Sequence, residues 1–314
     1  MEDPLITNGA LSANRLASGL AYVDLHFQNV PHVIATALVQ RDGLALIDPG
    51  PSSSLPVLER QLEAVGAGIG DVSALLLTHI HLDHAGATGT LLRRNPSLKV
   101  YVHDNGAPHL VDPGKLLASA SRLYGDAMDR LWGEVLPVPS GSIVALGGGE
   151  TIEAGGVRFE IAYTPGHASH HVSYFDRASG VAFVGDTAGV KVNGYTVPPT
   201  PPPDINLELW RESVARIAEW KPATLFLTHF GPVAPVPAHV AEFLDRLDLV
   251  AGLAKTSLDR PGSDAEREEW FVDQLRGELR QVMPEDEVRA YEVAGRFDLS
   301  WRGLARYWRK TVTR

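Results

Sequence analysis

The 314-residue chain has no cysteine, which excludes disulfide bonds, thiolate metal ligands and a cysteine nucleophile. It also has no apolar run approaching the roughly 18 residues that a membrane-spanning helix needs. The first residues, Met1-Glu-Asp-Pro, lack the basic start and the apolar core of a signal peptide. We therefore expect no membrane partner, and the cytoplasm is the default location.

Basic residues are outnumbered: 28 Lys and Arg stand against 38 Asp and Glu, which gives a net charge of −10. A surface of this sign repels a phosphate backbone, so we expect no nucleic acid partner. The chain also has no G-x-S-x-G motif, so nothing indicates a serine nucleophile elbow. Its hydrophobic content of 44% is ordinary for a folded globular protein.

Histidines, by contrast, are concentrated in one short segment. His79-Ile-His81-Leu-Asp83-His84 follows directly on the apolar run 74–78. Residues i and i+2 of an extended segment point the same way, so His79 and His81 can share one metal ion. Asp83 and His84 lie where the chain turns toward a helix, and can serve a second ion. A catalytic zinc takes about three protein ligands plus water, so these four donors predict a two-metal site.

Three further apolar segments each end in a candidate ligand. Alternation in 157–161 indicates a half-buried strand that ends shortly before Pro165-Gly-His167. The short apolar strands 181–184 and 224–228 are followed at once by Gly185-Asp186 and by His229. The near-repeat of Leu-Leu-Leu-Thr-His and Leu-Phe-Leu-Thr-His around His79 and His229 hints at two similar halves.

The remaining segments predict the surroundings of this site. Residues 20–50 are typical of paired strands, 54–65 of a helix, and 104–140 of an insertion whose apolar residues recur at helical spacing. Tyr124 and Trp132 in that insertion either wall a substrate cleft or simply pack a surface helix.

The second half of the sequence predicts a stiff loop beside the site and a helical C-terminal region. The proline-rich stretch 197–203 predicts a stiff rim to the site, and Asp204 is expected to cap the next helix. Residues 236–314 are charged and helix-like, with a capping box at Ser263-Asp-Ala-Glu266 and an amphipathic final helix over 300–310.

Together these motifs resemble the metallo-β-lactamase fold superfamily of metallohydrolases. The HxHxDH signature of that family corresponds to His79, His81, Asp83 and His84, and its later ligands correspond to His167, Asp186 and His229. Leu46-Ile-Asp48-Pro-Gly50 resembles the opening Asp motif. The segment 165–171 resembles the PGHTxGH segment of the glyoxalase-II-like branch, with His170 in place of Gly.

The resemblance implies a fold and a division of the chain. The fold is α/β, a four-layer αβ/βα sandwich of two mixed sheets, with a C-terminal helical extension. Residues 1–235 would form the metal-binding catalytic domain, and residues 236–314 the extension, which shapes the pocket or builds a homodimer.

The resemblance also implies the chemistry. His79, His81 and His167 would hold one divalent ion, and Asp83, His84 and His229 the other. Asp186 would bridge both, and Asp48 and His171 would support the ligands from behind. Zinc is the first expectation, with iron or manganese as alternatives. Thiol-containing zinc lactamases place Cys at the position of Asp186, so the Asp-bridged hydrolases remain.

The implied activity is hydrolysis of a small molecule: an ester, thioester, lactone or lactam. Asp83 would orient the attacking water and carry its proton. Two alternatives stay open: a mononuclear iron oxygenase like the sulfur dioxygenases, using mainly His79, His167 and Asp186, and a non-catalytic metal-binding protein. The remaining histidines are expected to be structural or at the surface, and they are His26, His32, His103, His109 and His239.

Overall fold

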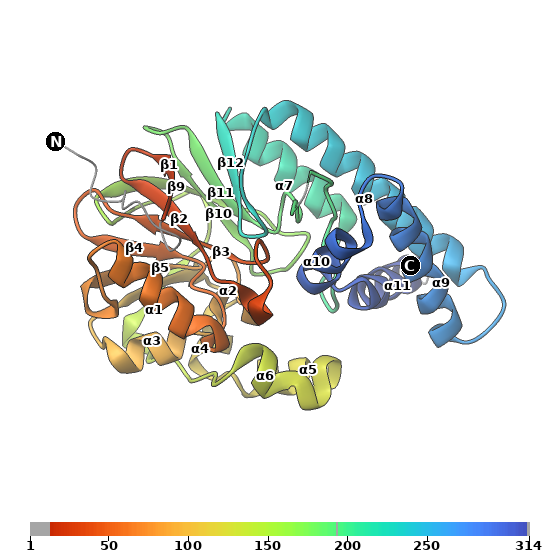
Figure 1. Ribbon diagram of the computed structural model, residues 1–314, viewed down its shortest axis with the longest axis horizontal. Coiled ribbons are helices and arrows are strands. Elements are labelled where there is room, and N and C mark those ends of the chain that lie inside the picture. The colour runs from red at the N-terminus through yellow and green to blue at the C-terminus, as the bar shows by residue number, and fades with distance from the viewer. Residues whose placement is uncertain (1–12, 193, 313–314) are drawn as a thin grey trace.

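The computed structural model describes residues 13–192 and 194–312. Two β-sheets are stacked face to face, helices cover both outer faces, and a helical region follows at the C-terminus (Figure 1). The predicted four-layer sandwich of two mixed sheets is therefore confirmed. No helix within the described ranges combines the length and apolar character that crossing a bilayer requires.

The first sheet has seven strands in the order of the sequence. Its first four strands pair antiparallel and its last four pair parallel, so the fourth strand belongs to both arrangements. The strands are β1 (Asn14–Ala17), β2 (Leu20–Asp24), β3 (Ala35–Val39), β4 (Leu44–Ile47), β5 (Val72–Leu76), β6 (Lys99–His103) and β7 (Ile143–Leu146).

The second sheet has six strands, in the order β13-β12-β11-β10-β9-β8. Only β11 and β12 pair parallel; the other neighbours are antiparallel. The strands are β8 (Thr151–Ala154), β9 (Val157–Tyr163), β10 (Val172–Asp176), β11 (Val181–Gly185), β12 (Thr224–Leu227) and β13 (Gly231–Val233).

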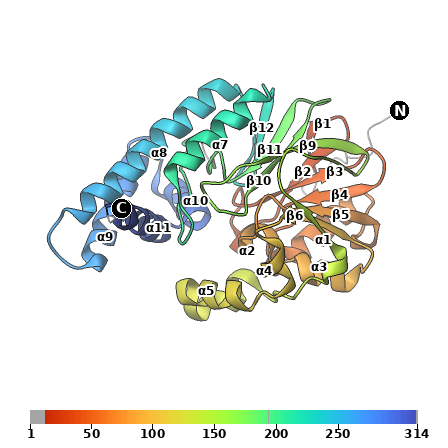
Figure 2. The ribbon, with the colours of Figure 1, turned by 180° about the vertical axis from the view of Figure 1, so that it is seen from behind.

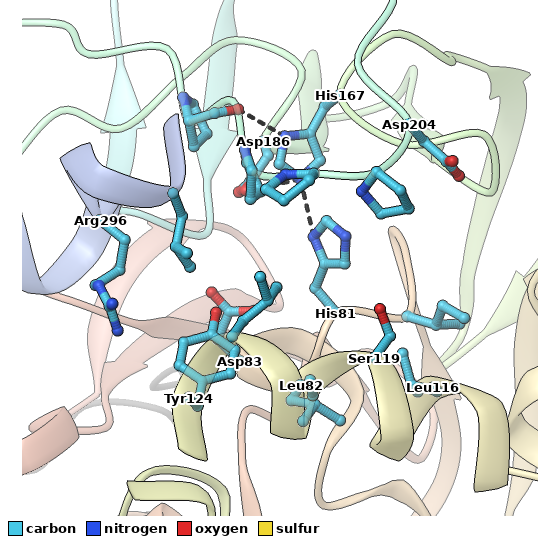
Figure 3. Close-up of a pocket in the computed structure, with 18 of the residues that line it drawn as sticks. His81, Leu82, Asp83, Leu116, Ser119, Tyr124, His167, Asp186, Asp204 and Arg296 are labelled. Carbon is cyan, nitrogen blue, oxygen red and sulfur yellow. Dashed lines mark hydrogen bonds and ion pairs between the residues drawn. The ribbon is translucent and has the colours of Figure 1, made fainter. Parts of the chain in front are cut away.

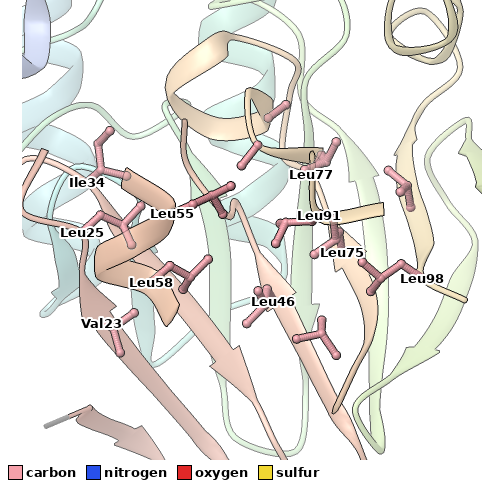
Figure 4. Close-up of a cluster of buried hydrophobic side chains, with 14 of the residues drawn as sticks. Val23, Leu25, Ile34, Leu46, Leu55, Leu58, Leu75, Leu77, Leu91 and Leu98 are labelled. Carbon is pink, nitrogen blue, oxygen red and sulfur yellow. The ribbon is translucent and has the colours of Figure 1, made fainter. Parts of the chain in front are cut away.

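Alternation along the strands divides the core into layers. Leu75 and Leu77 face outward into a cluster with Leu58 of α1 and Leu91 of α3 (Figure 4). Ala74 and Leu76 face inward and pack against the second sheet. Because the side-chain period of a strand is two, each strand supplies both layers. The helices on the first sheet's side are α1 (Leu55–Ala64), α2 (Leu82–Ala85), α3 (Thr88–Arg94) and α4 (Ala107–Val111).

The insertion between β6 and β7 is less regular than its sequence pattern predicts. The apolar residues that recur at helical spacing here fall in two separate helices, α5 (Gly114–Tyr124) and α6 (Met128–Trp132). They are joined by a 3₁₀ turn that begins at Gly125, whose φ of 51° is unfavourable for residues with a side chain.

The C-terminal helices pack on the second half of the sandwich. They are α7 (Leu207–Glu219), α8 (Val236–Leu258), α9 (Asp264–Arg280), α10 (Glu285–Gly295) and α11 (Phe297–Val312). Phe243 of α8 and Trp301 of α11 share one buried cluster with Trp210 of α7. In the view from behind, α10 and α11 lie above α5, and all three helices lie on the same side of the sandwich (Figure 2).

Two caps test the expected helix boundaries. The capping box at Ser263 and Glu266 is confirmed, since Ser263 Oγ accepts from the amide of Glu266 and the carboxylate of Glu266 accepts from the amide of Ser263. The expected cap at Asp204 is wrong. Helix α7 is capped instead by Asn206, whose side chain accepts from the amide of Leu209 at 2.9 Å. Asp204 accepts a hydrogen bond from Ser169.

Candidate metal centre

Parallel strands deliver the candidate ligands to one edge of the sandwich. His79 and His81 follow β5, Asp186 follows β11, and His229 follows β12. His167 lies in the turn between β9 and β10, at the same edge. All seven side chains predicted as ligands come together here, although their strands belong to two different sheets. Their role as ligands stays a prediction.

The first group consists of His79, His81 and His167. His81 Nδ1 lies 2.9 Å from His79 Nε2 and 3.0 Å from His167 Nε2. The three ligand atoms lie within 4.8 Å of one another, close enough to surround one ion. Extended backbone at His81 and the two-residue spacing place the first two rings on one side of the chain, as expected.

The second group consists of Asp83, His84 and His229. His229 Nε2 lies 3.4 Å from Asp83 Oδ2 and 3.3 Å from His84 Nε2. Asp83 and His84 belong to the short helix α2, which begins directly after His81, and the ring of His84 lies beside that of His79 with centroids 4.0 Å apart. These three atoms also lie within 4.8 Å of one another.

Asp186 reaches both groups. Its Oδ2 lies 3.3 Å from His167 Nε2, in the first group. Its Oδ1 lies 3.3 Å from His84 Nε2 and 3.5 Å from His229 Nε2, in the second. One carboxylate therefore faces the two groups with separate oxygens, which is the geometry that a bridging ligand requires.

Asp48 fixes His84 from behind and joins the two sheets. Its buried carboxylate accepts from His84 Nδ1 at 2.8 Å, from Thr78 Oγ1 at 2.7 Å and from Thr228 Oγ1 at 2.7 Å. Thr78 follows β5 in the first sheet and Thr228 follows β12 in the second. With Nδ1 donating to Asp48, His84 turns its Nε2 lone pair toward the second group.

Backbone carbonyls orient two more rings in the same way. His167 Nδ1 donates to the carbonyl of Pro199 at 2.8 Å, and His229 Nδ1 donates to that of Val33 at 2.5 Å. A neutral ring that donates through Nδ1 carries its lone pair on Nε2, so both rings can turn that lone pair toward a bound ion.

His171 and His170 take different positions. His171 is buried beneath Asp186, where its Nε2 accepts from the amide of Asp186 at 3.3 Å and its Nδ1 lies 3.0 Å from Thr164 Oγ1. It therefore holds the backbone that carries Asp186. His170 accepts from the amide of Ile80 at 3.4 Å and lines the cavity beside the cluster.

The pKa shifts of the clustered side chains indicate a site that favours positive charge. Burial opposes ionisation of Asp186, but His84 and His229 outweigh it and hold its pKa well below the usual range. Burial likewise opposes charge on His84, yet Asp186, Asp83 and Asp48 raise the pKa of His84 well above its usual value. Burial, aided by His84, lowers the pKa of His79 instead, so that ring is a neutral donor of electrons.

Divalent cations fit these residues. Asp186 Oδ1 is buried and accepts no well-aligned hydrogen bond from any residue that the structure describes. Ring nitrogens converge in both groups: those of the first group lie 2.9 and 3.0 Å apart, and those of His84 and His229 lie 3.3 Å apart. An ion in each group would satisfy the orphaned oxygen and the converging nitrogens together. Imidazole and carboxylate donors without thiolate suit zinc, iron or manganese.

A cavity of about 260 Å³ opens onto the cluster. Figure 3 shows Asp83, His81 and Asp186 at its base, with Tyr124 on one wall and Arg296 on another. The side chain of Asp83 is 24% exposed, against 5% for Asp186, so Asp83 is the carboxylate that a bound molecule meets first.

The walls come from three distant segments. Tyr124 and Trp132 of the insertion line the cavity, which confirms the cleft-wall interpretation, and the proline-rich stretch forms its rim. The third segment, where α10 meets α11, lies in the C-terminal extension, for which a role in the pocket was one of two expectations, and it contributes Arg296. His109, expected to be structural or at the surface, also lines the cavity. No spacing or motif in the sequence marks Arg296, which has a φ of 39° between two helices.

Comparisons with known proteins agree with the fold. The profile of the metallo-beta-lactamase superfamily matches residues 30–229. A metallo-beta-lactamase fold-containing protein of Sulfurisphaera tokodaii is 31% identical over 209 residues, covering 65% of this chain and 76% of that protein. A hydroxyacylglutathione hydrolase of a Synechococcus strain is 32% identical over 143 residues. That match covers 46% of this chain and less than half, 43%, of the relative.

Solved structures extend the likeness to most of the chain. The crystal structure of an archaeal metallo-beta-lactamase superfamily protein from Sulfolobus tokodaii is 25% identical, with a TM-score of 0.62, covering 91% of this chain and 98% of its own. A metallo-beta-lactamase family protein from Thermus thermophilus is 22% identical, with a TM-score of 0.70 and 94% of both chains covered. The second likeness shows the fold alone.

Proposed function

The chain belongs to the metallo-beta-lactamase superfamily, and from that premise we propose that it is a binuclear metal-dependent hydrolase of a small ester, thioester, lactone or lactam. The observation that carries this proposal is the position of Asp186, whose two oxygens face the two ligand groups separately. A complete second group would have no purpose in a mononuclear enzyme. Zinc is our first assignment, and iron and manganese suit the same donors.

The residues of the cluster have separable roles in this proposal. When bound, two divalent ions lower the pKa of a water molecule toward about 7 and polarise a substrate carbonyl. Asp83 orients that water and accepts its proton. Burial alone would raise the pKa of Asp83, but His84 and a hydrogen bond from His229 lower it to about 2, so the carboxylate is ionised at neutral pH. Asp48 and His171 hold His84 and Asp186 in place.

The substrate class follows from the cavity and the relatives. Among the similar proteins, several are named hydroxyacylglutathione hydrolase, which supports a thioester or ester substrate. The proposal for the chain organisation is a catalytic domain of residues 1–235 and an extension of residues 236–314 that completes the cavity through Arg296. The iron oxygenase alternative needs only the first group and Asp186, so the intact group of Asp83, His84 and His229 counts against it.

The test combines metal content with turnover. Elemental analysis of purified protein should approach two equivalents of divalent metal per chain. The same protein should hydrolyse at least one member of a panel of esters, thioesters, lactones and lactams, and lose that activity on chelation. One equivalent that added metal does not increase would contradict the binuclear assignment. Oxygen uptake by iron-loaded protein, with no hydrolysis, would favour the oxygenase.

A further inference from the structure

Tyr124 lies on the cavity wall with its ring held from two sides. The edge of Trp132 packs on it with ring centroids 5.0 Å apart, and the guanidinium of Arg296 lies 5.3 Å from its centroid. That guanidinium forms a bidentate ion pair with Asp298 through two hydrogen bonds of 2.9 and 2.8 Å. Two segments that are far apart in the sequence thus fix one phenol at the cavity.

The hydroxyl of Tyr124 is a donor without a partner. It forms no hydrogen bond with any residue in the described part of the chain, and it faces the same cavity as Asp83 (Figure 3). A phenol with an ordinary pKa of about 10 is protonated at neutral pH, and burial raises the pKa of this one further. An unused donor beside an exposed carboxylate of the cluster is placed to meet an oxygen of the bound substrate.

Beyond Tyr124 the cavity is lined mainly by apolar side chains. Leu116 and Leu123 contribute from α5, Val293 from α10 and Leu299 from α11. The positive charge of Arg296 is paired with Asp298, and Lys115 of α5 is a second cationic side chain in the lining. Burying apolar surface against such walls stabilises a complex, and more so for a longer alkyl chain.

We infer that the substrate carries an apolar acyl chain that lies between α5 and the α10–α11 junction, and that Tyr124 donates a hydrogen bond to its carbonyl oxygen. Tyr124 is then a specificity-determining residue contributed by the insertion. This inference rests on the proposed hydrolase function, because it places the reacting carbonyl beside Asp83.

The first experiment measures hydrolysis of acetyl, butanoyl, hexanoyl and octanoyl thioesters of N-acetylcysteamine. For the wild-type protein kcat/KM should rise from acetyl to octanoyl. Tyr124→Phe, which keeps the ring and its contacts, should lower kcat/KM about tenfold for each thioester. Tyr101→Phe is the matched control, because Tyr101 lies outside the cavity. The kcat/KM of Tyr101→Phe should stay within about twofold of the wild-type value, since substitutions away from a functional site have small effects.

A second variant tests the apolar wall. Leu123→Gln keeps a good helix former in α5 and should remove most of the preference for longer chains. Metal content and melting temperature of all variants should match the wild type, which separates a role in binding from a structural one.

Binding of octanamide, followed by calorimetry, gives a readout that needs no turnover. The wild type should bind it about tenfold more tightly than Tyr124→Phe does, and more tightly than it binds acetamide. If no thioester is hydrolysed but octanamide binds in this way, the proposed reaction fails and the cavity assignment stands. If Tyr124→Phe behaves like Tyr101→Phe in both assays, or acetyl and octanoyl thioesters react equally fast, the inference is overturned.

Discussion

The base of the site and its walls are built in opposite ways. The base consists of Asp48 and the seven clustered His and Asp side chains, which follow strands or lie in the short helix α2 and are buried except for His81 and Asp83. The walls consist of α5–α6, the proline-rich stretch and the α10–α11 junction, which are helices and loops with mainly apolar side chains. The comparison indicates that reactivity is fixed by the sheets, whereas the choice of substrate is set by segments that can change without disturbing them.

The largest effect is expected at the base, from Asp186→Ala. Removing the carboxylate that faces both groups leaves two sets of donors without a shared anion, so the variant should lose metal and at least about 100-fold in kcat/KM. Elemental analysis and turnover measure this. Asp204→Ala, a carboxylate of the rim, is the control and should keep its metal. A variant at position 186 with full metal and full turnover would show that the carboxylate does not bridge.

The next effect separates chemistry from binding within the base. Asp83→Asn keeps the shape of the side chain but removes its charge, so kcat should fall by about 100-fold, at the lower end of the range for lost acid–base catalysis. The Michaelis constant should change much less, because the loss falls on the transition state. Steady-state kinetics on the best substrate measure both. A rise in KM with unchanged kcat would refute the assigned role.

A smaller effect is expected in the walls, from Gly303→Ala in α11. A Cβ at this position would lie 2.0 Å from the carbonyl oxygen of Thr200, so the helix and the proline-rich rim must separate. Overpacking of this kind costs about 1–3 kcal/mol in the free energy of unfolding. Chemical denaturation measures it, and substrate preference should change while metal content does not.

The control for that substitution is Gly277→Ala in α9. A Cβ there meets nothing within 4 Å, so the better helix propensity of alanine should stabilise the protein by up to about 1 kcal/mol. If both glycine variants change stability equally, the close contact between α11 and the rim has no energetic weight.

The smallest effect is expected furthest from the site, at the capping box of α9. Ser263→Ala removes the side-chain acceptor for the amide of Glu266 and should lower the free energy of unfolding by about 1 kcal/mol. Metal content and kcat/KM should be unchanged. A loss of activity without a loss of stability would mean that α9 is coupled to the base more directly than the structure indicates.

The base could be predicted from the sequence because each of its parts is local. Asp186 and His229 directly follow short apolar strands, and His79 to His84 form a single segment, so strand periodicity and donor type were enough. The family resemblance implied that Asp48 supports the ligands, but it did not specify the contact to His84 or the link to Thr228 in the other sheet.

The walls could be predicted only in part, because they depend on how distant helices dock. The sequence indicated that Tyr124 and Trp132 lie near the site, but not that α5 ends at Gly125. Nothing in the pattern of 285–312 distinguishes Arg296 from other arginines, since its position is set by the angle between α10 and α11. At the start of α7, two polar residues, Asp204 and Asn206, were both acceptable caps, and tertiary contacts selected Asn206.

The division of the candidate ligands between two sheets has a consequence for how the protein matures. His79 and His81 meet His167, and Asp83 and His84 meet His229, only after the two halves of the chain have stacked. In a partly folded chain only some ligands of each group are close together. Closing the long loops between the others costs conformational entropy before an ion can bind. On the proposed assignment, ions therefore bind the finished fold almost exclusively, and each bound ion adds its binding free energy to the native state. Metal uptake then becomes the last step of folding, and metal content becomes a count of correctly assembled molecules.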